Sequence, residues 1–450
     1  MSYKKIIYTI ISVLLINNTN ALKIEIKQGE VKPEPIIIDN LNSTDGKKIS
    51  EIIKKDLELS SLFVIVSIAD RKLDTTNMKN LQSKGARFLL YGQMIDNNQI
   101  KFTLVDVITG KKLYKDKIVN INHSNIRETA HIIADYVYER ITNELGYFNT
   151  KIVYVNTVNN YPRTTQLVII DQDGANNNKL TNGKELVVSP RFAPDGKHIA
   201  YIAYTKDIKD IASNEKAKQA LIKSAHVYIS KIDSNSRKRL LNNDIMKELI
   251  RKNHGNPISM TYAPRFSPDG QSVVLAIIIN GTSAIYKYNM TDNQLIQLTK
   301  HDNIDTSPCY SHDGKKIVFT SNRVGTEGLY IMNSDGSDQH KISQEGGKYS
   351  QPVWSPRGDL IAFTKQIKNT FYIGVVKHDG SGERLIAKGY LVEAPIWSSN
   401  GRYIVCTYQS GPSEKSKILF TDVTGRYTRV IETQGDASSP AWSPTIQVKN

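Results

Sequence analysis

The sequence has little cysteine and no apolar run long enough to cross a membrane. Only Cys309 and Cys406 occur among its 450 residues. The repeat described below assigns them to units that are not neighbours, so we expect two buried thiols and no disulfide. The apolar run at residues 6–16 is far shorter than the roughly 20 residues of a membrane-spanning helix, and no other run is longer.

Common catalytic motifs are also missing. The sequence contains no G-x-S-x-G elbow, no H-E-x-x-H pair, no P-loop and no dinucleotide-binding glycine pattern. His131, His301 and His312 have no partners at metal-ligand spacing, and His131 falls in an expected helix, which favours a packing or surface role. We therefore expect no enzymatic activity, no cofactor and no catalytic or metal site.

The first 21 residues have the features of a secretory signal peptide. Lys4 and Lys5 precede the apolar run, and Thr19 and Ala21 place small residues at the −3 and −1 positions of a cleavage site. We expect cleavage after Ala21, a mature chain that begins at Leu22, and a soluble periplasmic protein. Retention of this segment as a membrane anchor is the alternative.

The formal net charge is +15, from 59 basic and 44 acidic residues. Such an excess is compatible with nucleic acid, anionic envelope polymers or an acidic protein partner. The basic residues do not alternate with aromatic ones, as a base-stacking surface requires, so we expect no binding to nucleic acid. A polyanion-binding module remains an alternative, and it rests on Arg237, Lys238 and Arg239.

The strongest signal is a phrase of the type Ser-Pro-Arg-Phe-Ser-Pro-Asp-Gly, which recurs six times. The first prolines of the six copies are Pro190, Pro264, Pro308, Pro352, Pro395 and Pro440. Subtraction of these positions gives steps of 74, 44, 44, 43 and 45 residues. A unit of about 40–50 residues is the size of a four-stranded propeller blade. The sequence therefore predicts a six-bladed β-propeller of WD40-like repeats.

Each unit reads as four short strands. The phrase forms the first strand, and an Asp-Gly or Asn-Gly turn leads into the second. Turn geometry explains the repeated acids Asp195, Asp269 and Asp313, although a calcium-binding series is the alternative.

The sixth copy of the phrase has no strands after it. Residues 151–155, 166–170 and 179–181 supply the missing three strands before the first copy. We therefore expect a last blade built from both ends of the domain, which removes an open sheet edge.

The first unit is longer than the others because it contains two insertions, one between Tyr201 and Tyr228 and one between Tyr228 and Pro264. Both fall in loops that emerge on the same face of a propeller. This placement suggests a binding face, and two tolerated surface loops are the alternative.

Residues 22–148 lack the repeat and read as an α/β domain, a mixed sheet packed on helices. We expect strands at residues 22–27, 35–38, 88–92 and 100–107 and a helix at residues 44–59. A second helix is expected to begin at Ser124 and to end at Gly146. The predicted organisation is a signal peptide over residues 1–21, the α/β domain over residues 22–148 and the propeller over residues 149–450.

These features together resemble the TolB family, the periplasmic component of the Tol–Pal cell-envelope system. Further matching stretches are residues 85–93, 104–106, 147–155 and 439–444. The resemblance covers essentially the whole mature chain. It implies a protein-binding scaffold that supports outer-membrane integrity and constriction during cell division.

The resemblance also implies two binding sites. The peptidoglycan-associated lipoprotein Pal would bind at the propeller funnel, and the inner-membrane protein TolA would bind the mature N-terminus, with an order–disorder switch linking the two. The expected Pal contacts lead into the first strands of the blades: Met260, Thr261, Tyr262, Ala263, Asp305, Thr306, Ser307, Tyr349, Ser350, Gln351, Glu393, Ser438 and Ser439. The expected TolA contacts are Leu22, Lys23, Ile24, Glu25, Ile26, Lys27, Gln28 and Gly29.

Some alternatives remain open at this stage. Many relatives carry a histidine where this chain has Met260, and plain loop structure is the alternative for the whole funnel set. An ordinary strand of the front domain is the alternative for residues 22–29. We expect a monomer, and further outer-membrane partners stay open. The other functional classes are the propeller domain of a periplasmic hydrolase and a polyanion-binding envelope protein.

Overall fold

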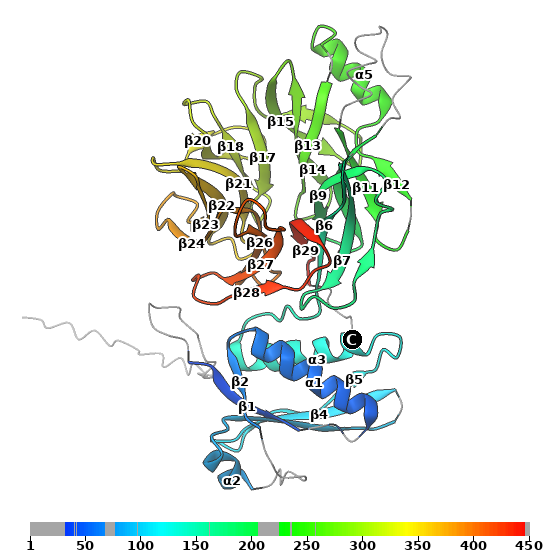
Figure 1. Ribbon diagram of the computed structural model, residues 1–450, viewed down its shortest axis with the longest axis vertical. Helices are drawn as coiled ribbons and strands as arrows, with labels where there is room; N and C mark the ends of the chain where they lie inside the picture. Colours follow the sequence, from blue (N-terminus) through cyan, green and yellow to red (C-terminus); the bar gives the residue numbers. More distant parts are fainter. Residues whose placement is uncertain are drawn as a thin grey trace, which may run out of the picture.

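The computed structural model describes residues 32–445, apart from residues 40, 42, 68–76, 97, 162, 206–224, 235 and 257. An N-terminal α/β domain lies against one side of a ring of β-sheets (Figure 1). The expected signal peptide, its cleavage point and the expected TolA segment lie outside the described residues, as does most of the first insertion. No helix in the described part of the chain has the length and apolar character of a membrane span.

The N-terminal domain is a five-stranded mixed sheet in the order β2-β1-β3-β4-β5. Its strands are β1 (Glu34–Ile38), β2 (Phe63–Ile65), β3 (Phe88–Met94), β4 (Gln99–Asp106) and β5 (Lys112–Asn120). Its helices are α1 (Thr44–Leu59), α2 (Met78–Ser83) and α3 (Ile126–Thr142). Apolar residues of α1 and α3, such as Ile49 and Ile133, share one core cluster with Ile36 of the sheet. The α/β prediction is confirmed.

The predicted bounds of the last helix are wrong at both ends. Asn125 is the residue before α3, and Ser124 instead donates its backbone N–H and its hydroxyl to Oδ1 of Asn122, at 3.1 and 2.6 Å. The helix ends at Thr142 because Asn143 adopts a left-handed conformation with φ of 58°. Gly146 therefore lies beyond the helix.

Six blades of four strands form the ring, and the six-blade prediction is confirmed. The first two blades are joined into one sheet by a short parallel contact between their strands at Ala225 and Met260. The first two blades are β9 (Leu186–Phe192), β10 (His198–Tyr204), β11 (Ala225–Lys231), β12 (Arg237–Arg239), and β13 (Ile258–Phe266), β14 (Ser272–Ile279), β15 (Thr282–Asn289), β16 (Leu295–Gln297). The third and fourth are β17 (Asp305–Tyr310), β18 (Lys316–Ser321), β19 (Gly328–Asn333), β20 (His340–Lys341), and β21 (Lys348–Trp354), β22 (Ile361–Ile367), β23 (Thr370–Val376), β24 (Arg384–Gly389). The fifth is β25 (Leu391–Trp397), β26 (Tyr403–Gln409), β27 (Lys417–Asp422) and β28 (Thr428–Ile431).

The sixth blade joins the two ends of the propeller, as the sequence predicted. It consists of β29 (Asp436–Trp442), β6 (Lys151–Asn160), β7 (Arg163–Asp171) and β8 (Asn178–Lys179). Trp442 pairs with Ile152 in the antiparallel ladder, and its indole N–H donates to the hydroxyl of Thr150 at 2.8 Å. The ring therefore has no open edge between its ends.

The second insertion of the first blade forms a helix, α5 (Asn243–Lys252), where only a loop was expected. The side chain of Asn242 accepts a hydrogen bond from the backbone N–H of Ile245 and caps the helix. Met246 and Leu249 lie one turn apart and are buried in the core between the first two blades. This apolar spacing explains why the segment is helical.

Elsewhere in the propeller, Cys309 and Cys406 are both buried and free, as predicted.

Candidate functional site

The repeated phrase places a bulge in the inner strand of every blade. The residue before the first proline has a positive φ, between 49° and 54°, in all six copies: Ser189, Ala263, Ser307, Gln351, Ala394 and Ser439. The ladder register shifts at this point in each blade. None of the six is β-branched, in keeping with the cost of a left-handed conformation for such residues. The proline that follows has no N–H to donate and fits a bulge.

Most of the bulges lie at the middle of their inner strands, and the residues before each bulge lead in from the side of the ring that carries the connections between blades. We call this side of the ring the funnel face: it carries these connections and the loops between second and third strands. The N-terminal domain contacts the opposite side, where the turn residues Asn400 and Gln172 donate hydrogen bonds to Leu145 and Asp56. The funnel face is therefore left uncovered by the N-terminal domain (Figure 1).

The residues with which each inner strand leads in from the funnel face are called the strand entrances. Ten of the thirteen residues expected to bind Pal lie partly exposed at these entrances: Met260, Tyr262, Ala263, Thr306, Ser307, Ser350, Gln351, Glu393, Ser438 and Ser439. They come from the second to the sixth blades, so the ring brings together residues up to 179 positions apart, from 260 to 439. Glu393 has no hydrogen bond or ion pair within the described residues, and burial raises the pKa of its carboxyl group.

The other three expected contacts, Thr261, Asp305 and Tyr349, are buried and use their polar groups inside the propeller. Thr261 accepts a hydrogen bond from the N–H of Val227 at 3.1 Å. Asp305 pairs with Arg323 at 3.0 Å, and the hydroxyl of Tyr349 donates to a carboxylate oxygen of Glu383 at 2.8 Å. These side chains pack inside the propeller beneath the strand entrances and are not exposed to a partner.

Large apolar side chains are exposed around the same face. Tyr161 is 97% exposed, and the others are Val158, Ile304, Val324 and Tyr390. They lie in or next to the loops between second and third strands and the connections between blades. Exposed apolar side chains that gather on one face, rimmed by polar groups, are typical of protein interfaces.

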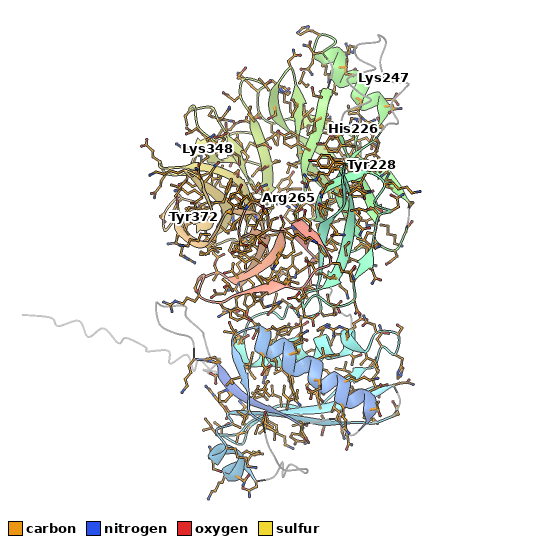
Figure 2. The ribbon with its side chains drawn as sticks, in the orientation of Figure 1. His226, Tyr228, Lys247, Arg265, Lys348 and Tyr372 are labelled. Atoms are coloured by element: carbon orange, nitrogen blue, oxygen red, sulfur yellow. The ribbon has the colours of Figure 1, made fainter. Side chains whose placement is uncertain are left out.

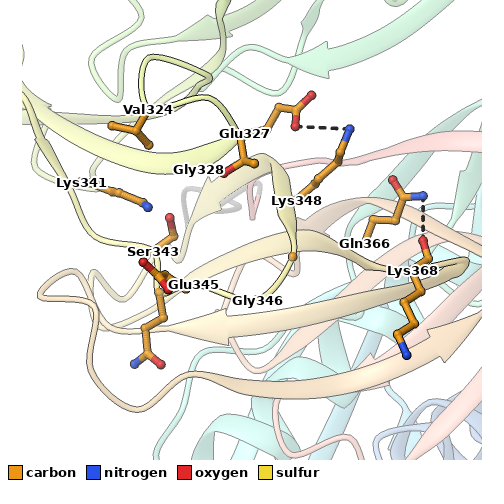
Figure 3. A pocket seen from close by; sticks show the side chains of 13 residues that line it. Val324, Glu327, Gly328, Lys341, Ser343, Glu345, Gly346, Lys348, Gln366 and Lys368 are labelled. Atoms are coloured by element: carbon orange, nitrogen blue, oxygen red, sulfur yellow. Dashed lines mark hydrogen bonds and ion pairs between the residues drawn. The ribbon is translucent and has the colours of Figure 1, made fainter.

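A polar groove of about 630 Å³ crosses this face between the third and fourth blades (Figure 3). Glu327 and Lys348 form an ion pair across it at 3.6 Å, and Lys341 and Lys368 add two further ammonium groups to its lining. The groove extends the funnel face outward from the inner strands.

The opposite face is held to the N-terminal domain by a buried network of charges. His131 of α3 lies with its Nδ1 atom 2.6 Å from Oδ2 of Asp56 in α1 and its Nε2 atom 3.6 Å from Asp171 of β7. Arg127 contacts Asp171 and Asp173 at 2.9 and 2.6 Å. Burial alone lowers the pKa of His131, but the neighbouring carboxylates of Asp56 and Asp171 raise it to about 9.

His131, Asp171 and Asp173 lie close enough to hold a metal ion, with ligand atoms within 4.8 Å of one another. Both carboxylate oxygens of Asp171 already form ion pairs, Oδ2 with Arg127 and Oδ1 with Lys151. The arrangement is therefore an ion-pair junction between two domains. His131 has a buried packing role, which the sequence left undecided between packing and surface.

Comparison with known proteins identifies the family. Residues 22–113 match the family model of the TolB amino-terminal domain, and residues 138–446 match that of the TolB beta propeller domain. The chain belongs to the TolB family. Membership in the TolB family indicates a non-enzymatic protein, which agrees with the lack of catalytic motifs in the sequence.

Relatives with the name Tol-Pal system protein TolB align with nearly the whole chain. The protein from Rickettsia massiliae (strain Mtu5) is 38% identical over 473 aligned positions, which cover 98% of this chain and 100% of the relative. The protein from Rickettsia prowazekii (strain Madrid E) is 37% identical over 469, with coverage of 98% and 99%. TolB from Acinetobacter baumannii has the same fold, with a TM-score of 0.76 at 23% identity over 92% of this chain and 97% of that one.

Proposed function

We propose that this chain is a periplasmic protein-binding scaffold of the Tol–Pal system, that its funnel face binds Pal, and that residues 22–29 of the mature chain bind TolA. The names of the relatives support membership in that system. The resemblance described above supports the assignment of the two partners. Through these contacts the protein would support outer-membrane integrity and constriction during division.

One observation carries the Pal assignment. The face opposite the N-terminal domain combines a ring of partly exposed inner-strand entrances with exposed apolar side chains such as Tyr161 and Tyr390. An interface of standard size buries about 800 Å² on each partner and needs an apolar centre with a polar rim. Six strand entrances around one ring offer a curved surface of that character.

The test is a titration of the purified protein with Pal. Replacing Ala263→Arg and Thr306→Arg together places two long cations at neighbouring entrances, and binding should fall by at least about a hundredfold because bulk and unpaired charge are forced into the interface. The matched control is Thr291→Arg with Ser381→Arg, which adds the same charge at exposed turns on the opposite side of the ring. Equal affinity of the two double variants would remove the funnel assignment.

The TolA assignment has its own test. A mature chain that lacks residues 22–27 should lose TolA binding and keep its affinity for Pal, because the deletion lies in the other domain. An N-terminal segment with alternating apolar residues can add as a strand to the edge of a partner sheet. Retained TolA binding by the truncated chain would contradict the assignment.

A further inference from the structure

Two arginines occupy positions in the inner strands where the other blades carry small or apolar residues. Arg265 and Arg191 each follow the first proline of their phrase. The equivalent residues of the other four blades are Cys309, Val353, Ile396 and Ala441. The strands β9 and β13 that carry the arginines lie against each other. Figure 2 places Arg265 near the middle of the ring, where the inner strands surround the central channel.

The direction of the Arg265 side chain follows from its strand pairing. Arg265 pairs with Val274 of β14, and directly paired residues project from the same face of a sheet. Val274 packs against Tyr310 of the third blade. Arg265 therefore extends toward the inner strand of the third blade, beside Cys309, and burial lowers its pKa.

No carboxylate pairs with either arginine among the residues that the structure describes. Arg191 donates to the carbonyl oxygen of its neighbour Pro190 at 2.6 Å, and Arg265 has neither hydrogen bond nor ion pair there. Arg323 and Arg402 are matched differently, since Arg323 pairs with Asp305 and Arg402 pairs with Glu144, both at 3.0 Å. Both arginines are only partly exposed and lack a counter-charge, and a bound anion offsets the cost of partly desolvating such a cation.

We propose that the central channel contains an oxyanion site built on Arg265, with Arg191 of the neighbouring blade as its second cation. The planar guanidinium group matches the two oxygens of a carboxylate or a phosphate. Such an oxyanion can come from free inorganic phosphate or from an acidic side chain of a partner on the funnel face. Arg265 follows Ala263 along a strand that enters from that face, so the site lies just deeper than the expected Pal contacts.

The first experiment does not depend on the proposed function. Inorganic phosphate is titrated into the purified full-length mature protein at low ionic strength, and binding is followed by calorimetry. Replacing Arg265→Leu should weaken binding by about tenfold or more, the value of one charge-assisted hydrogen-bonded pair. Arg163→Leu is the matched control, because Arg163 is an exposed arginine at the start of β7 on the same face and its loss changes the net charge equally.

The second experiment uses Pal as the probe and separates the two sources. If phosphate does not bind the wild-type protein but Arg265→Leu weakens Pal binding about tenfold while Arg163→Leu does not, the oxyanion is a carboxylate of the partner. If Pal does not bind the wild-type protein, the funnel proposal fails, and the phosphate titration still decides the site. If neither phosphate nor Pal binds Arg265→Leu more weakly than it binds Arg163→Leu, the inference is overturned.

Two further variants keep the test decisive if Arg265→Leu does not fold. Arg265→Lys keeps the charge and loses the two-pronged geometry, so it should weaken binding severalfold. Arg191→Leu removes the second cation and should do the same. Circular dichroism and thermal unfolding establish that each variant is folded. Unchanged affinity in both folded variants also overturns the inference.

Discussion

The Nδ1 atom of His131 lies 2.6 Å from Oδ2 of Asp56, and both side chains are buried where the N-terminal domain meets the propeller. The Nε2 atom of the same ring faces Asp171 of the sixth blade. One imidazolium thus lies between carboxylates from two domains. This contact holds α1 and α3 against the side of the ring that lies opposite the funnel face.

The charge on His131 makes stability depend on pH. Its pKa is about 9 in the folded protein, above the ordinary value of 6.5, so its contribution is complete below about pH 6.5 and is lost as the pH rises through about 9. We expect the free energy of unfolding of the wild-type protein to fall by roughly 2–3 kcal/mol more than that of His131→Gln between those values. Urea unfolding at a series of pH values measures this difference. His198→Gln, at an exposed histidine, should follow the wild type, and a parallel profile for His131→Gln would contradict the prediction.

Glu144 secures the same junction at a second point. Its carboxylate accepts from Arg402 and Arg357 of two blades, each at 3.0 Å, and the side chain of Arg402 is only 6% exposed. Replacing Glu144→Ala leaves the charge of Arg402 buried without its partner, so we expect a loss of about 3–5 kcal/mol in the free energy of unfolding. Glu51→Ala breaks an exposed pair with Lys54 and should cost less than about 1 kcal/mol. Similar losses in the two variants would show that the junction is not stabilised by this pair.

The left-handed residues of the inner strands predict a specific pattern of tolerance. Ser307 has a φ of 52° and is partly exposed. Ser307→Asn should be nearly neutral because asparagine tolerates this conformation, whereas Ser307→Val should cost about 1–2 kcal/mol. Thr306→Val, one residue earlier in extended backbone, is the control and should change little. Urea unfolding of the three variants checks the order, and equal stability of Ser307→Val and Ser307→Asn would contradict it.

The fold was largely predictable because its signals are local and repeated. The phrase around Pro308 carries its own turn, aromatic residue and spacing, and six copies with strands on both sides require a ring closed by pairing near Trp442. The bulges were missed although the phrase contains them, since a residue before proline is normally read as extended. The helix α5 was missed because it occurs once and has no repeat to support it.

The candidate site was only partly predictable. The positions of the strand entrances follow from the repeat. Whether a side chain there is buried depends on the face of the strand from which it projects, so Tyr349 is buried while its neighbour Ser350 is partly exposed. The junction around His131 joins residues from α1, α3 and β7 that are far apart in sequence. No spacing rule connects Asp56 with Asp171, so only the folded arrangement reveals their contact.

Hydrogen exchange of the protein with and without Pal tests the proposed binding face most directly. Bound Pal should slow exchange at the strand entrances 260–263, 304–307, 349–351 and 391–393 and leave the turns that face the N-terminal domain unchanged. Protection confined to those turns or to the N-terminal domain, or no protection at saturating Pal, would contradict the assignment of the funnel face.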